Sequence, residues 1–91
     1  MKVRYTRNAL QDLSDIHTYI AQDNPDAANR VIVRLRESID LICVFPDLGR
    51  RGTIDGTREF VATRLPYIIV YQTTPDEVHI LNVFHDARQR G

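Results

Sequence analysis

The stretch "PYIIVYQ", residues 66–72, decides which kind of fold this chain can adopt. It contains five aliphatic or aromatic residues in a row, Tyr67 to Tyr71, and no charged residue. A continuous apolar run of this length is typical of a β-strand that is buried on both faces. The sequence therefore predicts a sheet in which this segment is a central strand that needs cover on both sides.

The segments on either side of this strand predict two further strands. Upstream, "TREFVAT" (57–63) alternates between two faces, so that Glu59 points away from Arg58. Downstream, "VHILNVF" (78–84) follows "TPDE" (74–77), whose Pro and Asp are typical turn residues. We therefore expect three antiparallel strands, the last two joined as a hairpin.

The first half of the chain shows the spacing of two amphipathic helices. Thr6 is the expected N-cap of the first helix, and Asn24 with Pro25 is the expected start of the second. The apolar positions of the first helix are Leu10, Leu13, Ile16, His17 and Ile20. Those of the second are Ala28, Val31, Ile32, Leu35, Ile39 and Ile42. Because only a few residues connect them, the helices are predicted to form an antiparallel hairpin that ends at Pro46.

A short strand expected at residues 2–5 completes the order β-α-α-β-β-β. The prediction is an α+β fold, an antiparallel sheet with the helical hairpin packed on one face, in a single domain spanning residues 1–91. Two helices cover only one face of such a sheet, yet the strand at 67–71 is apolar on both. The second face is then covered either by neighbouring strands and loops of the same chain or by a partner chain.

The composition argues against several classes of protein. Twelve basic and twelve acidic residues give a formal net charge of zero, so no direct nucleic-acid binding is expected. No apolar run is long enough to span a bilayer, and the first residues do not resemble a secretion signal. Cys43 is the only cysteine, which fits a cytoplasmic location. His17, His79 and His85 lack metal-ligand spacing, so neither a metal nor a cofactor is expected.

Five local patterns, taken together, resemble the RelE/ParE superfamily of small bacterial toxins, and more closely its ParE branch. They are "ALQDLSDIHTYIAQDNPDAANRV", "FPDLGRRG", "GTREFV", "PYIIVYQ" and "ILNVFHDARQ", in the family's order and over nearly the whole chain. The resemblance implies the same β-α-α-β-β-β fold and the toxin half of a type II toxin–antitoxin system. It also implies a partner, a cognate antitoxin, which is a small DNA-binding protein whose disordered segment wraps around the toxin.

The superfamily divides by target. RelE-like members cut messenger RNA in the ribosomal A site, whereas ParE-like members poison DNA gyrase and are not known to have catalytic residues. In RelE-like toxins an Arg follows the Tyr of the middle strand, a second cation follows the last strand, and a Tyr lies near the C-terminus. The corresponding positions here hold Ile68 and Asp86, and no Tyr follows Tyr71. The resemblance therefore favours a ParE-like inhibitor of DNA gyrase without catalytic residues of its own.

Two alternatives stand beside this interpretation. A RelE-like, ribosome-dependent endoribonuclease would draw its cations, acid and base from Arg58, Arg64, Glu59 and His85. A non-toxic family member would act only in complex formation. For the ParE-like inhibitor, the expected target-binding residues are His85, Arg88 and Arg90. The expected antitoxin-binding residues are Tyr67, Ile68, Ile69, Val70 and Tyr71, together with Arg58 and Arg64.

Overall fold

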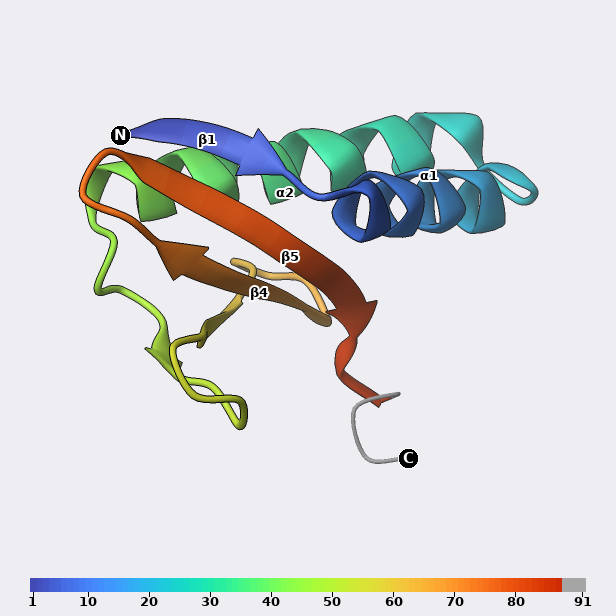
Figure 1. Ribbon diagram of the computed structural model, residues 1–91. Helices are drawn as coiled ribbons and strands as arrows, with labels where there is room; N and C mark the ends of the chain where they lie inside the picture. Colours follow the sequence, from blue (N-terminus) through green and yellow to red (C-terminus); the bar gives the residue numbers. More distant parts are fainter. Residues whose placement is uncertain (88–91) are drawn as a thin grey trace.

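Near residue 50 the chain passes from helices to strands, as the change of sequence period predicts (Figure 1). The structure is a computed structural model that describes residues 1–87. Its elements are, in chain order, β1 (Lys2–Tyr5), α1 (Arg7–Ala21), α2 (Pro25–Val44), β2 (Arg50–Arg51), β3 (Arg58–Val61), β4 (Tyr67–Thr73) and β5 (Glu77–His85). The predicted α+β fold and element order are confirmed. The additional strand β2 is only two arginines long, so no periodicity could reveal it.

Both helices begin at the side chains that the sequence indicates. Thr6 Oγ1 accepts a 3.0 Å hydrogen bond from the amide of Ala9. Asn24 Oδ1 likewise accepts a 3.0 Å hydrogen bond from the amide of Ala27, and Pro25 occupies the first turn, where no amide proton is needed. These bonds satisfy amide groups that have no partner inside the first helical turn. The predicted helical hairpin is therefore defined largely by local contacts.

The five strands form one sheet in the order β1-β5-β4-β3-β2. The last three strands pair antiparallel, as predicted, and β2 pairs antiparallel with β3. β1, however, pairs parallel with β5, so the sheet is mixed rather than wholly antiparallel. The reason is topological: two helices and three strands separate β1 from β5 along the chain, and no hairpin forces them to run in opposite directions.

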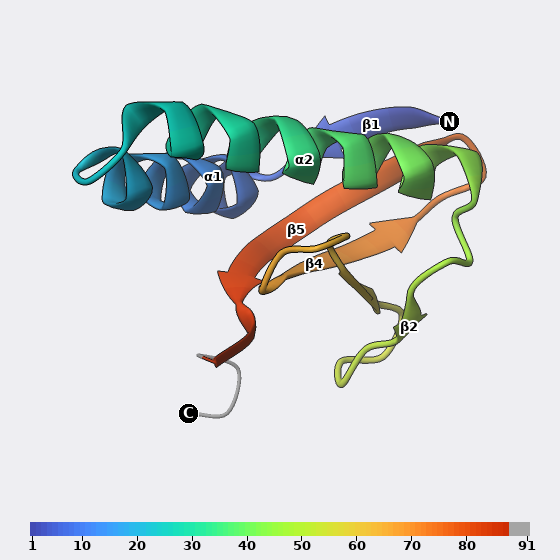
Figure 2. The ribbon, with the colours of Figure 1, turned by 180° about the vertical axis from the view of Figure 1, so that it is seen from behind.

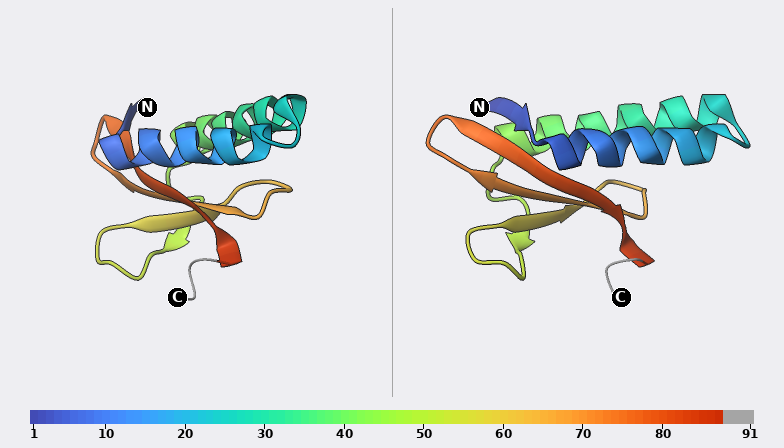
Figure 3. Two further views of the ribbon diagram at one scale, coloured as in Figure 1. Left: turned by 90° about the vertical axis from the view of Figure 1, so that its right-hand side faces the viewer. Right: turned by 45° about the vertical axis from the view of Figure 1, so that its right-hand side comes forward.

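Both helices lie against the same face of the sheet, which gives the molecule two layers (Figures 2 and 3). The buried core between the layers comprises Ala9, Ile16, Leu35, Ile39, Ile42, Ala62, Tyr67, Ile69, Tyr71, Val78, Ile80 and Val83. One position differs from the sequence-based expectation. Leu10 is 55% exposed, because Ala9 takes the inward position on α1.

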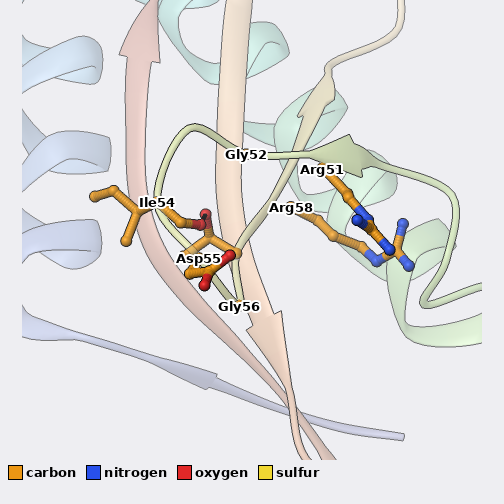
Figure 4. A pocket seen from close by; sticks show the side chains of 7 residues that line it. Arg51, Gly52, Ile54, Asp55, Gly56 and Arg58 are labelled. Carbon is orange, nitrogen blue, oxygen red and sulfur yellow. Dashed lines mark hydrogen bonds between the residues drawn. The ribbon is translucent and has the colours of Figure 1, made fainter.

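Neither helix covers the opposite face of the sheet, which we call the open face (Figure 3). Ile68 lies on this face but is only 1% exposed. In register it is flanked by Val61 and Phe84, and the loop 52–57 between β2 and β3 crosses the same face (Figure 4). For Ile68, cover by neighbouring strands and loops is therefore confirmed, whereas Val70 remains half-buried.

Candidate functional site

The strand register fixes which side chains share the open face, because residues paired across a sheet point to the same side. Three successive rows cross β5 and β4, the first of them extending onto β1 and the other two onto β3. They are Arg4, His79 and Gln72; Asn82, Val70 and Glu59; and Phe84, Ile68 and Val61. The open face thus changes from a polar row, through a mixed row with one carboxylate, to an apolar row.

Over the mixed row, the loop 52–57 encloses a cavity of about 350 Å³. Val70 and Phe84 provide apolar wall, and Glu59 lies among the polar lining groups. Glu59 is only 7% exposed, although it belongs to a strand near the edge of the sheet. Its Oε1 lies 3.4 Å from Nη2 of Arg50, whose own side chain is 63% exposed. A buried carboxylate therefore faces a cavity on the open side of the sheet.

A second cavity, of about 340 Å³, lies between α1 and the end of β5. Asp15 and Tyr19 line it from α1, and Tyr67 and His85 line it from the sheet. The rings of Tyr67 and His85 meet edge to face, with their centroids 5.4 Å apart. This cavity places His85, a predicted target-binding residue, beside the helices and away from the open face.

Asp12 closes the free edge of β5. Because β1 pairs with β5 only as far as Ile80, the groups farther along that edge need other hydrogen-bond partners. Thr6 Oγ1 donates a 2.8 Å hydrogen bond to the carbonyl of Leu81, and Asp12 Oδ2 accepts a 2.9 Å hydrogen bond from the amide of Val83. Beyond the end of β1, the side chains of Thr6 and Asp12 therefore provide hydrogen-bond partners for the backbone of β5.

Arg58, predicted to contact a partner or a substrate, is engaged within the chain. Its Nη1 donates a 2.7 Å hydrogen bond to the carbonyl of Gly49, and its Nη2 lies 3.4 Å from Oδ1 of Asp47. The hydroxyl of Tyr71 donates a 2.7 Å hydrogen bond to the carbonyl of Pro46 and accepts a 2.8 Å hydrogen bond from the amide of Gly49. Burial raises the pKa of this phenol. Both side chains therefore hold the loop between α2 and β2.

The loop between β2 and β3 also shapes a basic corner, with a cavity of about 400 Å³ (Figure 4). Arg51 lies directly opposite Arg58 in the strand register, and their side chains extend in the same direction. Ile54 extends the other way, over β5 (Figure 4). One short loop therefore separates a basic corner from the carboxylate-lined cavity on the open face.

The four residues that a ribonuclease would use do not converge. Arg58 faces the helices and Glu59 the open face, since successive residues of a strand point to opposite sides. His85 pairs with the first residue of β4 and Arg58 with the fifth, a separation of about 13 Å along the strand. Arg64 lies in the turn between β3 and β4, where its φ is 61°.

Of the five β4 residues predicted to contact an antitoxin, only Val70 is appreciably accessible on the open face. Three of them, Tyr67, Ile69 and Tyr71, belong to the core beneath the helices. Sequence reasoning missed two neighbours of Val70 in the adjoining row, Val61, which is 52% exposed, and Phe84, which is half-buried. Both lie beside Ile68 in the strand register, so it is the register and not a sequence period that identifies them.

The predicted target-binding set is placed only in part. His85 is half-buried at the end of β5, where its Nδ1 accepts a 3.1 Å hydrogen bond from the amide of Ala87. Arg88 and Arg90 lie outside the described residues.

The described residues also bear on metal binding and on membrane insertion. Within residues 1–87, no group of three or more His, Cys, Asp or Glu residues is placed to hold a metal ion. In the same part of the chain, no helix is both long and apolar enough to cross a membrane.

The family model of the ParE toxin of the type II toxin–antitoxin system parDE matches residues 3–90. The chain belongs to the ParE toxin family. This ParE-family chain is 43% identical over 88 residues to Y4kP of Sinorhizobium fredii, described as a candidate toxin; the match covers 97% of the chain and 91% of the relative. It is 39% identical over 87 residues to Toxin RelE2 of Caulobacter vibrioides, covering 96% and 97%. The predicted membership of the RelE/ParE toxin superfamily is confirmed.

Solved structures share the fold of this ParE-family chain. A chain of the chromosomal ParDE toxin–antitoxin system of P. aeruginosa superposes with a TM-score of 0.81 at 23% identity, covering 93% of this chain and 95% of that one. A chain of the RelBE2 toxin–antitoxin complex of Mycobacterium tuberculosis gives a TM-score of 0.63 at 24% identity, covering 92% and 95%. Both branches of the superfamily therefore share this architecture, and fold alone does not separate them.

Proposed function

We propose that this ParE-family toxin acts by binding and inhibiting DNA gyrase, and that a cognate antitoxin holds it inactive by covering the open face. One observation carries the proposal: the apolar row of the open face surrounds the position where a ribonuclease of the superfamily has an arginine. Ile68 occupies that position, with Val61 and Phe84 on either side. The adjoining mixed row contributes the carboxylate of Glu59.

This chemistry does not suit RNA cleavage. Metal-free cleavage builds negative charge on the scissile phosphate, so cations must lie next to it. Three apolar side chains offer no such stabilisation, and the carboxylate of Glu59 would repel the phosphate backbone. Arg50, the cation opposite Glu59 in the strand register, is paired with that carboxylate. Arg58, which directly precedes Glu59 on β3, points to the other face of the sheet. There its guanidinium contacts the carbonyl of Gly49 and the carboxylate of Asp47.

The open face suits contact with another protein. Half-buried and exposed apolar side chains, Val61, Val70 and Phe84, lie together beside polar groups, which is the composition of a protein interface with an apolar centre and a polar rim. We assign these side chains to the antitoxin. The gyrase contact is assigned to the end of β5 and the residues after it, at His85, Arg88 and Arg90. Both proteins would be met in the cytoplasm.

A ribosome-dependent ribonuclease is the second candidate, because the Caulobacter relative at 39% identity carries the name RelE2. The two candidates differ in what happens to cells that express the toxin. A gyrase inhibitor leaves messenger RNA intact and causes DNA-damage signalling. A ribonuclease leaves DNA intact and cuts transcripts at positions set by the reading frame.

Inducible expression of the full chain in a bacterium, with and without its antitoxin, tests the proposal. A DNA-damage reporter and primer extension on cellular transcripts are read from the same culture. We expect the reporter to rise and transcripts to stay intact, and we expect the reporter response to disappear when the antitoxin is co-expressed. Codon-positioned cuts without a reporter response would instead assign the chain to the ribonucleases.

A further inference from the structure

The cavity on the open face combines a buried carboxylate with apolar walls. Glu59 lines the cavity and is only 7% exposed. Val70 and Phe84 form its apolar walls, and Ile54 lines it from the loop 52–57. Asp12 contributes a second carboxylate. A site in which carboxylates lie next to apolar surface selects a ligand that is itself part cation and part hydrocarbon, because each part then finds a matching environment.

The loop that roofs this cavity is held by its own hydrogen bonds. The amide of Gly52 donates a 2.8 Å hydrogen bond to the carbonyl of Thr57, and the hydroxyl of Thr57 donates a 2.6 Å bond to the carbonyl of Ile54. A Cβ atom at Gly52 would collide with the Thr57 side chain, so the loop closes tightly at this point. The cavity is therefore formed before a ligand arrives, which reduces the entropic cost of binding.

The charges around the cavity favour a cation. Two carboxylates, Glu59 and Asp12, line it, and Arg50 pairs with Glu59 from a largely exposed position. No Lys, Arg or His residue lines the cavity within the described part of the chain. A second guanidinium can join Arg50 at Glu59 and the Val83 amide at Asp12, since each carboxylate accepts about four hydrogen bonds.

The size of the cavity suits one side chain. About 350 Å³ is at the lower end of the range for small-molecule sites, about 300–1,000 Å³. An arginine fits this space and chemistry: its methylene groups pack on Val70, its planar guanidinium stacks on the Phe84 ring, and its fork of donors meets a carboxylate. A lysine ammonium has neither the stacking surface nor the fork.

We propose that this cavity binds a single arginine side chain of the antitoxin. The identity of the partner rests on the proposed function; the arginine chemistry rests on the cavity alone. In the complex, the arginine lies between the loop 52–57 and the mixed row of the open face, next to Glu59. The antitoxin is thereby fixed in one register across the sheet.

The cavity is tested first with a small probe. N-acetyl-arginine N-methylamide is titrated into the ¹⁵N-labelled full chain, with the citrulline analogue as a neutral isostere and the lysine analogue as a second cation. We expect saturable shifts at the amides of Thr57, Val70 and Asn82 with arginine, weaker binding of lysine, and none of citrulline. Glu59→Gln is expected to weaken arginine binding about tenfold, the effect of losing one charge-assisted hydrogen bond.

A second variant keeps this test valid if Glu59→Gln perturbs the pair with Arg50. Ile54→Ala shortens a side chain that is 70% exposed, so it leaves the core unchanged. It is expected to weaken arginine binding measurably while the amide spectrum elsewhere stays the same. Equal binding of the citrulline and arginine analogues, tighter binding of lysine than of arginine, or no saturable shift with arginine would each overturn the proposal.

The partner is tested by calorimetry with the full-length cognate antitoxin. Each antitoxin arginine is changed to glutamine, and binding to the wild-type toxin is compared with binding to Glu59→Gln. We expect one arginine whose loss costs about tenfold against the wild type and little against the variant. Antitoxin binding in which no arginine is coupled to Glu59 would overturn this inference and leave the proposed function standing. A failure of the antitoxin to bind the wild type would overturn both.

Discussion

The amide of Gly49 donates a 2.8 Å hydrogen bond to the hydroxyl of Tyr71, and a Cβ atom at Gly49 would lie 2.8 Å from that same hydroxyl. The bond and the close approach explain each other, because only a residue without a side chain lets the loop reach the buried phenol. The hydroxyl donates its own hydrogen bond to the carbonyl of Pro46. The middle strand is therefore fastened to the loop that follows α2.

Tyr71→Phe tests this connection. The change removes both hydrogen bonds of the hydroxyl and leaves the amide of Gly49 without that partner, so we expect the free energy of unfolding to fall by about 2–3 kcal/mol. Urea denaturation measures it. Tyr19→Phe is the matched control, since Tyr19 is 71% exposed, and should change stability little. Equal midpoints for both variants would mean that the two bonds contribute nothing net.

Asp12→Ala tests how the edge of β5 is protected. The amide of Val83 loses a charged acceptor at 2.9 Å, which should cost about 1.5–3 kcal/mol and speed hydrogen exchange at that amide. Asp15→Ala, one turn farther along α1 at an exposed position, is the control. If the Val83 amide exchanges at the same rate in both variants, Asp12 does not protect this edge.

Glu77 gives the fold a pH dependence with a definite sign. Hydrogen bonds from Arg4 at 2.8 Å and His79 at 2.9 Å hold the pKa of Glu77 below its ordinary value of 4.5. A depressed pKa in the folded state means stabilisation that is present above the ordinary pKa and is lost as the pH falls through the folded value.

Melting temperatures of the wild type and Glu77→Gln should therefore differ near neutral pH and converge as the solution is acidified below about pH 4.5. Glu37→Gln, at an exposed position of α2, serves as the comparison and should show no gap that closes on acidification. A Glu77→Gln gap that widens in acid would contradict the assigned direction.

The helices were predictable because their signals are local. Thr6, Asn24 and Pro25 act within a few residues of their own position, and each occupies the predicted cap or first turn. The parallel pairing of β1 with β5 was not predictable, since it joins residues 2–5 to residues 77–80 and leaves no mark in either segment.

The candidate site depended on register, which the sequence leaves open. Both alternating sets of the middle strand are apolar, so the pattern does not say whether Ile68 or Ile69 faces the helices. In β5 the register shifts, and Leu81 has no partner on β4, so Ile80 and Val83 both face the core although they are three residues apart. The burial of Glu59 likewise depends on a loop that folds back over it.

The proposed gyrase contact predicts a separation of two functions. Arg88→Ala should weaken toxicity, by about tenfold if one charge-assisted contact is lost, while antitoxin affinity stays unchanged. Arg34→Ala, an exposed arginine of α2, is the control and should leave both properties unchanged. Toxicity is measured as growth inhibition at matched expression, and affinity by calorimetry. Loss of antitoxin binding in Arg88→Ala would place the antitoxin, rather than the target, at the end of the chain.

Supercoiling of relaxed plasmid by purified DNA gyrase tests the central proposal most directly. The purified toxin is added with ATP, alone or after incubation with its antitoxin. The account predicts that the toxin alone stops supercoiling, that the antitoxin restores it, and that a messenger RNA on translating ribosomes stays whole at the same toxin concentration. Normal supercoiling at that concentration, together with cuts in the ribosome-bound messenger, would contradict it.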